Sequence, residues 1–235
     1  MKKPANKSRF IVTNIKKETP DVVTIFLSSS GQKLTYKAGQ YVAVHLDKNK
    51  DSHGRFYSIS SSPLEKELAL TVKKIGQFSS ALHNLKIGDA VYLSGPYGWF
   101  YPEMEMKHVV FLAAGIGVTP FFSILKDHAK HSLKQRIDLY YSNKTFQDIT
   151  FYDEINKLTK IDLLEVHYHL TRDSLRDKLI NGHKRISVDD VKKDLGHLKG
   201  KSFYICGSIG FVSDLRKQLL SAKVREDSIF TESFF

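Results

Sequence analysis

Two different spacings of hydrophobic residues divide the chain into two parts. Before residue 100, short runs rich in β-branched and aromatic residues are separated by turns, which is typical of antiparallel strands. The predicted strands cover residues 10–12, 22–27, 41–46, 68–72 and 91–93. Helical spacing is confined to residues 78–85, where Phe78, Leu82 and Leu85 fall on one side. Regularly spaced strands with a single short helix predict an antiparallel β-barrel.

Beyond residue 103, strands alternate with helices. Residues 108–113 form a continuous apolar run, which is typical of a parallel strand that is buried on both faces. Further strands are predicted at 137–141, 164–170, 202–206 and 228–230, and helices at 151–158, after a cap at 187–190, and at 211–220. Another helix begins at Thr119 and Pro120, with Thr119 as its N-cap. This order predicts a doubly wound α/β domain with a parallel sheet.

The two parts meet in a segment dense in glycine, proline and aromatic residues, at positions 95–102. Because such segments interrupt regular structure, we place a domain boundary there. The expected domains are residues 1–102, the β-barrel, and residues 103–235, the α/β domain.

One stretch of the barrel carries residues suited to a cofactor. In a strand, Arg55, Tyr57, Ile59 and Ser61 share one face, and Phe56, Ser58 and Ser60 the other. A guanidinium suits a phosphate, an aromatic plane suits a flat ring, and hydroxyls suit ring nitrogens and oxygens. This combination indicates a flat, phosphorylated cofactor such as a flavin nucleotide. The alternative is a Ser-rich edge strand without a ligand.

Two glycine-containing turns precede predicted helices. Gly76, Gln77, Phe78 and Ser79 stand before the helix of the barrel, where free N–H groups can bind a phosphate or simply be capped. Gly115 and Gly117 follow the first strand of the α/β domain, which is the context of a dinucleotide-binding turn. Thr119 and Pro120 stand where the third glycine of the usual fingerprint is expected. A turn with glycines for geometry alone is the alternative.

Further candidates lie at strand ends of the α/β domain. Cys206 and Gly207 end the fourth strand, beside the crevice where doubly wound sheets bind ligands, although a lone cysteine is also a common core residue. Thr171 and Arg172 end the third strand, and Lys184 and Arg185 follow it. These side chains suit a 2′-phosphate, or they belong to a generally basic surface.

No metal site is expected from the sequence. His167 and His169 alternate on one strand face, but no carboxylate or third ligand stands at a recognisable spacing from them. At the C-terminus, Phe234 and Phe235 either pack on the core or cover a ring in the active site.

Composition excludes several classes of protein. The lone cysteine rules out an intrachain disulfide, a cysteine-held iron–sulfur cluster and a four-cysteine zinc site. No run of about 18 apolar residues is present, and the basic N-terminus lacks the apolar core of a signal peptide. We therefore expect a cytoplasmic protein without a membrane association.

The net charge of +11 is unevenly distributed. Up to Pro102 there are 15 Lys and Arg against 7 Asp and Glu, and from Glu103 onward 21 against 18. A solvated surface, attraction of an acidic partner and nucleic-acid binding are the alternatives. No helix-turn-helix, zinc-finger or RNA-binding signature is found, which disfavours nucleic acid.

Taken in order, these motifs resemble the ferredoxin–NADP(+) reductase superfamily of flavoproteins. The resemblance covers nearly the whole chain and rests on Arg55-x-Tyr57-Ser58-x-x-Ser61, Gly76-x-x-Ser79, Gly95-Pro96-x-Gly98, Gly115-x-Gly117-x-Thr119-Pro120, Cys206-Gly207 and Glu232-x-Phe234. It implies a barrel that holds FAD and an α/β domain that holds NADP, with NAD as the alternative.

The resemblance also implies roles for single residues. Arg55 would bind the FAD pyrophosphate with help from residues 76–79, Tyr57 would pack on the isoalloxazine, and Ser58 would hydrogen-bond near its hydride-accepting nitrogen. The turn from Gly115 to Thr119 would hold the NADP pyrophosphate, and Thr171 and Arg172 its 2′-phosphate. Cys206 and Glu232 would flank the nicotinamide. Phe234 matches a C-terminal aromatic that stacks on the flavin in some members, and the extra Phe235 leaves open which ring does so.

The expected function is hydride transfer from NADPH to bound FAD, followed by single-electron transfer to a separate acceptor. The basic barrel indicates an acidic carrier, ferredoxin or flavodoxin, or an oxygenase component. An NAD(P)H:flavin reductase that releases its flavin is the first alternative, and a basic nucleic-acid-binding module is the remote one.

Overall fold

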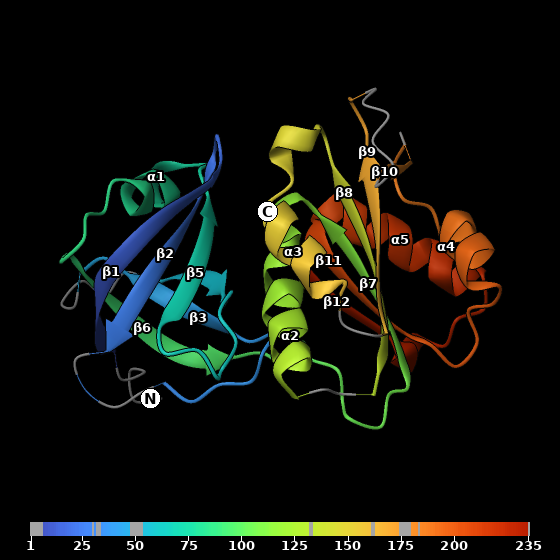
Figure 1. Cartoon of the computed structure of the whole chain (residues 1–235), viewed down its shortest axis with the longest axis horizontal. Coiled ribbons are helices and arrows are strands. Elements are labelled where there is room, and N and C mark those ends of the chain that lie inside the picture. Colours follow the sequence, from blue (N-terminus) through green and yellow to red (C-terminus); the bar gives the residue numbers. More distant parts are fainter. Residues whose placement is uncertain are drawn as a thin grey trace.

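The computed structural model describes residues 7–29, 31, 34–47, 54–131, 134–160, 163–173, 180–182 and 184–234. They form two units side by side, one built of strands and the other of a sheet covered by helices (Figure 1). Among the residues described, no helix has the length and apolar character needed to cross a bilayer.

The first unit is an antiparallel sheet with the order β4-β3-β6-β1-β2-β5. Its elements are β1 (Ser8–Thr19), β2 (Val22–Ser29), β3 (Tyr41–His45), β4 (Arg55–Ser58), β5 (Leu68–Lys73), α1 (Gln77–His83) and β6 (Ala90–Tyr97). The two edge strands meet where Ile59, just after β4, bridges to Leu70 on β5. The sheet thereby closes into the predicted barrel around side chains such as Val42, Val44 and Val72.

The second unit is a parallel sheet with the order β10-β9-β8-β7-β11-β12. Its elements are β7 (His108–Ala114), α2 (Val118–His131), β8 (Arg136–Asn143), α3 (Tyr152–Leu158), β9 (Leu164–Leu170), β10 (Ile180–Gly182), α4 (Val188–Leu195), β11 (Ser202–Ser208), α5 (Ile209–Ser221) and β12 (Ile229–Phe234). The fold class predicted from the sequence is confirmed.

The apolar run of β7 is explained by layers on both faces of the sheet. Phe111 and Ala113 pack into the cluster under α2 and α3, whereas Val110 and Leu112 pack into the cluster under α4 and α5. Because both faces are covered, every residue from Val109 to Ala113 is fully buried.

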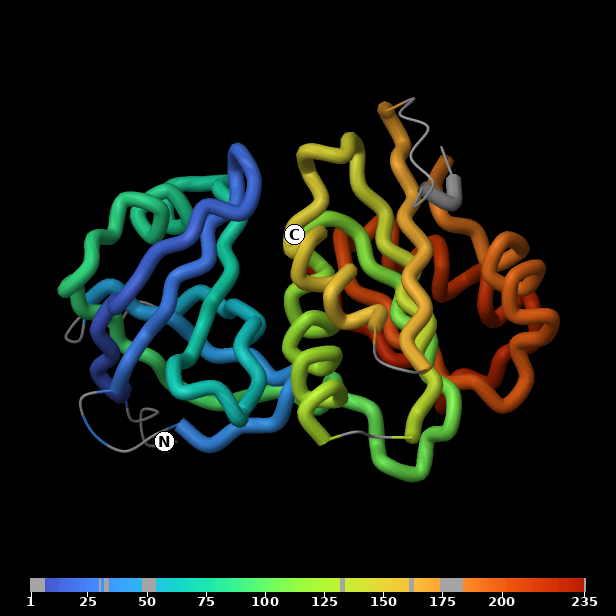
Figure 2. The backbone as a smooth tube through the Cα atoms, in the orientation of Figure 1, coloured from blue at the N-terminus to red at the C-terminus, as the bar shows by residue number. Residues whose placement is uncertain are grey.

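Helix α2 also faces the barrel, so it is shared by both units. Ala38 and Phe100, which come from the chain before β7, belong to the same apolar cluster as Phe121 and Ile124 of α2. In Figure 2, the green tube of α2 lies between the barrel and the remainder of the second unit. The domain boundary after residue 102 stays a prediction.

Several predicted element bounds need correction. Thr119 is not an N-cap, because a 3-10 turn (Gly115–Gly117) leads directly into α2 at Val118, and the Thr119 hydroxyl donates to the carbonyl of Ile116. Strand β6 continues through the glycine- and proline-rich segment as far as Tyr97. Strand β10 was not predicted, since it contains only three residues. The cap at Ser187 is confirmed, because its hydroxyl accepts the N–H of Asp190.

Candidate functional site

One cavity of about 790 Å³ lies where the two units meet. Its lining side chains come from both units: Leu46, Arg55, Phe56, Tyr57, Ser58, Thr71, Lys73, Ile75, Gly76, Gln77, Phe78, Ser79, Ala81, Ile116, Thr119, Ser233 and Phe234. A volume of this size falls within the range of about 300–1,000 Å³ that is usual for cofactor pockets.

Strand β4 supplies the polar and aromatic centre of this cavity. The ring of Tyr57 stacks on that of Phe78 from α1, with 6.3 Å between centroids and 20° between planes. Burial raises the pKa of Tyr57 to about 12, so its hydroxyl stays protonated. The Ser58 side chain is buried, and its Oγ has no hydrogen-bond partner among the described residues. A buried hydroxyl without a partner is costly, and a ligand atom in the cavity would satisfy it.

The sequence pattern did not place Ser61 correctly. Strand β4 ends at Ser58, and the chain then turns toward β5, so the alternation of faces stops there. Ser61 is fully buried, and its hydroxyl bonds the hydroxyl of Tyr36 and accepts the N–H of Ala69. It is therefore a structural residue of the barrel and does not line the cavity.

The first turn of α1 and the Gly76 that precedes it line the cavity with Gly76, Gln77, Phe78 and Ser79. The Ser79 hydroxyl accepts the N–H groups of Ile75 and Gly76 and donates to the carbonyl of Gly76. Its hydrogen bonds thus stabilise the turn, while the surrounding backbone forms the wall.

The turn before α2 approaches the end of β11 closely. A Cβ atom at position 117 would lie 2.3 Å from the carbonyl oxygen of Cys206 and 2.8 Å from the nitrogen of Gly207. Gly115 adopts a φ of +52°, which favours glycine. Ile116 and Thr119 from this segment reach the cavity.

Cys206 and Glu232 are neighbours, but neither is among the described residues that line the cavity. They pair across the parallel strands β11 and β12. Cys206 is fully buried, and burial followed by the nearby Glu232 raises the pKa of its thiol well above the usual value. Burial also raises the pKa of Glu232 to about 7.

The raised pKa of Glu232 predicts how the free energy of unfolding depends on pH. Between the ordinary pKa of 4.5 and about 7, the folded protein keeps a proton on Glu232 that the unfolded chain has released. The stability contributed by Glu232 is therefore present at low pH and lost as the pH rises through 7. Relative to Glu232→Gln, the free energy of unfolding of the wild type should fall over this interval and then level off. Urea unfolding at a series of pH values measures it, and a constant difference between the two proteins would contradict the assignment.

The basic residues predicted for a 2′-phosphate lie away from the cavity wall. Thr171 and Arg172 follow β9, with their N–H groups bonded to the carbonyls of Asn143 and Lys144. Arg172 and Arg185 are exposed, and Lys184 forms an ion pair of 2.8 Å with Asp190. Phe234 lines the cavity, whereas Phe235 lies outside the described residues.

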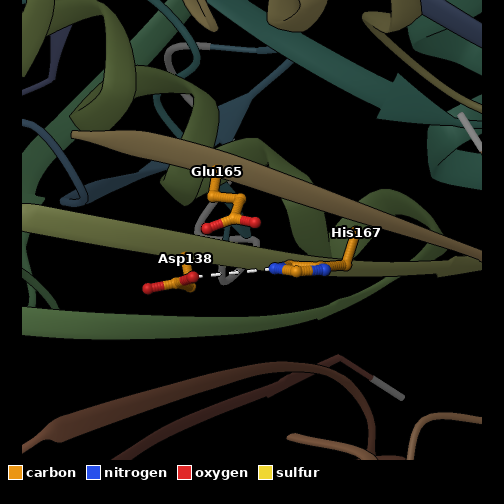
Figure 3. A group of neighbouring side chains, drawn as sticks. All are labelled: Asp138, Glu165 and His167. Atoms are coloured by element: carbon orange, nitrogen blue, oxygen red, sulfur yellow. Dashed lines mark ion pairs between the residues drawn. The ribbon is translucent and has the colours of Figure 1, made fainter. Parts of the chain in front are cut away.

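His167 of β9 has acidic neighbours that the spacing of residues in the sequence did not reveal. His167 meets Asp138 of β8 and Glu165, with the potential ligand atoms within 4.8 Å of one another (Figure 3). No carboxylate was recognised from sequence spacing, but Glu165 stands two residues before His167 on β9, and Asp138 comes from the adjacent strand. The Arg136 guanidinium already supplies positive charge there, since Nη2 lies 3.4 Å from Asp138 Oδ1 and 3.0 Å from Glu165 Oε2.

The sequence also missed several residues of the cavity wall. Thr71 and Lys73 share one face of β5, and Ile75 follows with the same alternation. The period-two pattern could have identified them once β5 was placed beside β4. Nothing in the side-chain chemistry marks four other wall residues as ligand-binding, namely Leu46, Ala81, Ile116 and Ser233.

Comparison with known proteins agrees with this architecture. An oxidoreductase FAD-binding domain model matches residues 10–101, and an oxidoreductase NAD-binding domain model matches residues 111–217. The chain is 30% identical over 240 residues to a flavohemoprotein from Vibrio cholerae and 26% identical over 246 residues to flavohemoprotein A from Dictyostelium discoideum. Each alignment covers 96% of this chain, but only 58% and 59% of those relatives. The chain thus spans about three-fifths of their length.

Two solved structures show the same fold. The FAD/NAD-binding domain of a nitric oxide dioxygenase from Vibrio cholerae superposes with a TM-score of 0.82 at 28% identity, covering 97% of this chain and 98% of that one. A ferredoxin–NADP(+) reductase from Neisseria gonorrhoeae with bound FAD and NADP has a TM-score of 0.84 at 23% identity, covering 99% and 100%. With its FAD-binding barrel and its NAD(P)-binding α/β domain, the chain belongs to the ferredoxin–NADP(+) reductase superfamily of FAD-dependent NAD(P)H oxidoreductases.

Proposed function

We propose that the protein uses NADPH to reduce bound FAD and then passes single electrons to a separate acidic electron carrier or oxygenase component. The observation that carries the proposal is the shared cavity, whose wall combines Arg55, Tyr57 and Ser58 of the barrel with Thr119 and Phe234 of the second unit. A redox reaction between two cofactors needs both binding surfaces to meet in one place.

The residues fit the cofactors as follows. Bound FAD would supply the chemistry of accepting a hydride and releasing electrons singly, and the protein would bind and orient it. Arg55 supplies a guanidinium for the pyrophosphate, Tyr57 an aromatic face for the isoalloxazine, and Ser58 a hydroxyl without a protein partner. These three side chains would contact the phosphate, the plane and the reactive edge of a flavin nucleotide.

The second unit provides the nicotinamide side. The turn of Gly115, Gly117 and Thr119 would hold the NADP pyrophosphate, and Thr171 and Arg172 the 2′-phosphate. Cys206 and Glu232 would flank the nicotinamide. Because burial raises its pKa, Cys206 contributes a neutral side chain and not a thiolate.

A visible spectrum of the purified protein, followed by anaerobic titration with NADPH and then NADH, tests the proposal. A yellow protein that is bleached at lower concentrations of NADPH than of NADH supports it. A colourless protein that turns over only when free flavin is added would instead identify a flavin reductase that releases its product.

The charge of the barrel makes a prediction about the acceptor. If the excess of basic residues before residue 103 attracts an acidic carrier, the second-order rate constant for reducing a ferredoxin or flavodoxin should fall several-fold between about 0.05 and 0.3 M ionic strength. Stopped-flow mixing of the reduced protein with the carrier measures it. An uncharged quinone is the control acceptor and should show little salt dependence. Equal behaviour of the two acceptors would rule out electrostatic attraction.

A further inference from the structure

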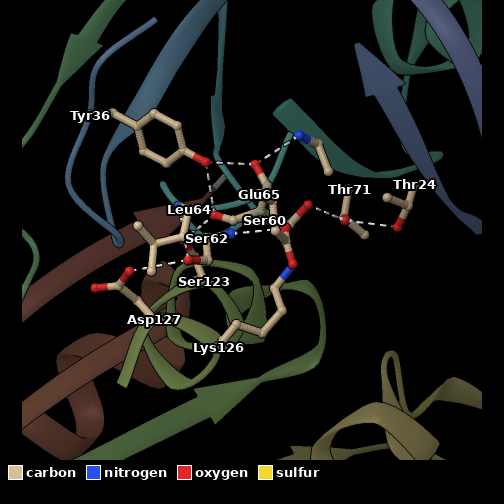
Figure 4. Close-up of polar contacts among 12 residues, drawn as sticks. Thr24, Tyr36, Ser60, Ser62, Leu64, Glu65, Thr71, Ser123, Lys126 and Asp127 are labelled. Atoms are coloured by element: carbon tan, nitrogen blue, oxygen red, sulfur yellow. Dashed lines mark hydrogen bonds and ion pairs between the residues drawn. The ribbon is translucent and has the colours of Figure 1, made fainter. Parts of the chain in front are cut away.

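A short loop of the barrel is bound directly to helix α2 by three polar contacts (Figure 4). The Ser123 hydroxyl donates to the Ser61 carbonyl at 2.5 Å, and the Ser62 hydroxyl donates to Asp127 at 3.1 Å. Lys126 forms an ion pair with Glu65, with Nζ 2.8 Å and 3.0 Å from the two carboxylate oxygens. We call this set of contacts the interdomain clamp.

The centre of the interdomain clamp is shielded from water. Ser61, Ser62 and Ser123 are fully buried, and the Lys126 side chain is only 19% exposed. Burial outweighs the attraction of Glu65 and lowers the pKa of Lys126, which also lies 4.6 Å from the centroid of the Phe122 ring. Buried polar contacts of this kind fix one geometry, because moving either partner leaves an unsatisfied group behind.

On each side, the interdomain clamp lies only a few residues along the chain from a residue of the cavity wall. Ser61 follows Ser58 by three residues, or about 10 Å of chain. Ser123 follows Thr119 by four residues, about one turn of α2. Ser58 and Thr119 both line the cavity, so the Ser61–Ser123 contact joins two segments that each carry a residue of the cavity wall.

The loop side is itself held rigidly. The Ile59 N–H donates to the carbonyl of Gln40, and the Ser60 N–H to that of Ala69. Tyr36 bonds both the hydroxyl and the carbonyl oxygen of Ser61. A shift of α2 would therefore not be absorbed by the loop and would be transmitted to the end of β4, where Ser58 lies.

We propose that Ser62, Glu65, Ser123, Lys126 and Asp127 are positioning residues for hydride transfer: they set the separation of the flavin and nicotinamide rings without touching either. This inference rests on the proposed function. The rate of transfer between two bound rings is steeply sensitive to their separation, and a misplacement of about 1 Å can cost about 100-fold.

The test compares the Glu65→Gln/Ser123→Ala double variant with the wild type. FAD content and the dissociation constant for NADP(+) should be unchanged. The stopped-flow rate of FAD reduction by NADPH should fall about 10- to 100-fold, and the long-wavelength charge-transfer absorbance of the ring pair should decrease with it. The absorbance reports ring contact directly, which a merely stabilising contact would not change.

Three further variants keep the test decisive. The charge exchange Glu65→Lys/Lys126→Glu should recover rate and absorbance relative to Glu65→Lys alone. Glu154→Gln is the matched control, because it removes another ion pair between the units, to Lys16, that joins no cavity-lining segment, and it leaves the pair of Lys16 with Glu18 in place. Glu154→Gln should behave as wild type.

Unchanged rate and absorbance in the double variant would overturn the inference, as would a loss of FAD in proportion to the loss of rate. Failure of the wild type to reduce FAD with NADPH would instead overturn the proposed function. The two failures are therefore distinguishable.

Discussion

The Ser58→Ala variant is expected to accept hydride from NADPH about 10- to 100-fold more slowly than the wild type while keeping its FAD. Ser58 Oγ is buried on the cavity wall without a hydrogen-bond partner among the described residues, and we expect a ligand in the cavity to supply one. A hydrogen bond to a group that gains charge contributes about 1.5–3 kcal/mol, which corresponds to about 10- to 100-fold in rate. Stopped-flow reduction at saturating NADPH measures the effect.

Ser60→Ala is the matched control for this variant. Ser60 lies two residues further along and is equally buried, but its hydroxyl accepts from Thr71 and does not line the cavity. We expect Ser60→Ala to lower stability and leave the rate of hydride transfer within about two-fold, because a single hydrogen bond within the barrel contributes about 1 kcal/mol. If Ser58→Ala reduced FAD at the rate of wild type, Ser58 would have no role at the reactive edge.

The Asp138→Asn variant is expected to lose about 3–5 kcal/mol of the free energy of unfolding. Asp138 is fully buried, with His108 Nε2 2.5 Å away and Arg136 Nε at 3.2 Å. Burial acts to raise the pKa of this carboxyl, but the bonds from His108 and Arg136 outweigh it and hold the pKa below its usual range. Removing the charge leaves the Arg136 guanidinium and the His108 ring without the carboxylate that they share.

The pH dependence of this loss follows from the lowered pKa. A depressed pKa contributes stability above the unfolded-state value of 3.8, and that contribution disappears as the pH falls toward the folded-state value. The difference between wild type and Asp138→Asn should thus be constant above about pH 5 and shrink below pH 4. Glu165→Gln is the control: it removes a well-exposed partner of the same arginine and should cost less than about 1 kcal/mol. Equal losses in both variants, measured by urea unfolding, would contradict the role of Asp138.

The local pattern of hydrophobic and polar residues was enough to predict most of the fold. The apolar run beginning at Val109 identified a parallel strand covered on both faces, and the arrangement of β1 to β6 followed from short β-branched runs. In the site, Arg55, Tyr57 and Ser58 were found because three kinds of chemistry stand in one strand of four residues. Ser61 was placed wrongly because the alternation of faces was carried beyond the end of β4.

Contacts between distant segments could not be predicted in the same way. Asp138 and His167 lie 29 positions apart and meet only because β8 and β9 are neighbours in register. The interdomain clamp joins Ser61 to Ser123 across two units whose relative placement no local spacing encodes. Lys73 reaches the cavity because β5 closes the barrel against the end of β4. These features depend on the tertiary arrangement, which becomes visible only when the strands are in place.

The fold requires glycine at position 117 whether or not a nucleotide binds. The space that its Cβ would need is occupied by the carbonyl of Cys206 and the nitrogen of Gly207, and thus by the protein's own backbone. A descendant that had lost its nucleotide would therefore still require glycine there for the turn after β7 to approach the end of β11. Gly117 therefore records how this turn packs on the sheet, and nucleotide binding in any diverged copy of this chain has to be judged from side chains such as Thr119 and Arg172.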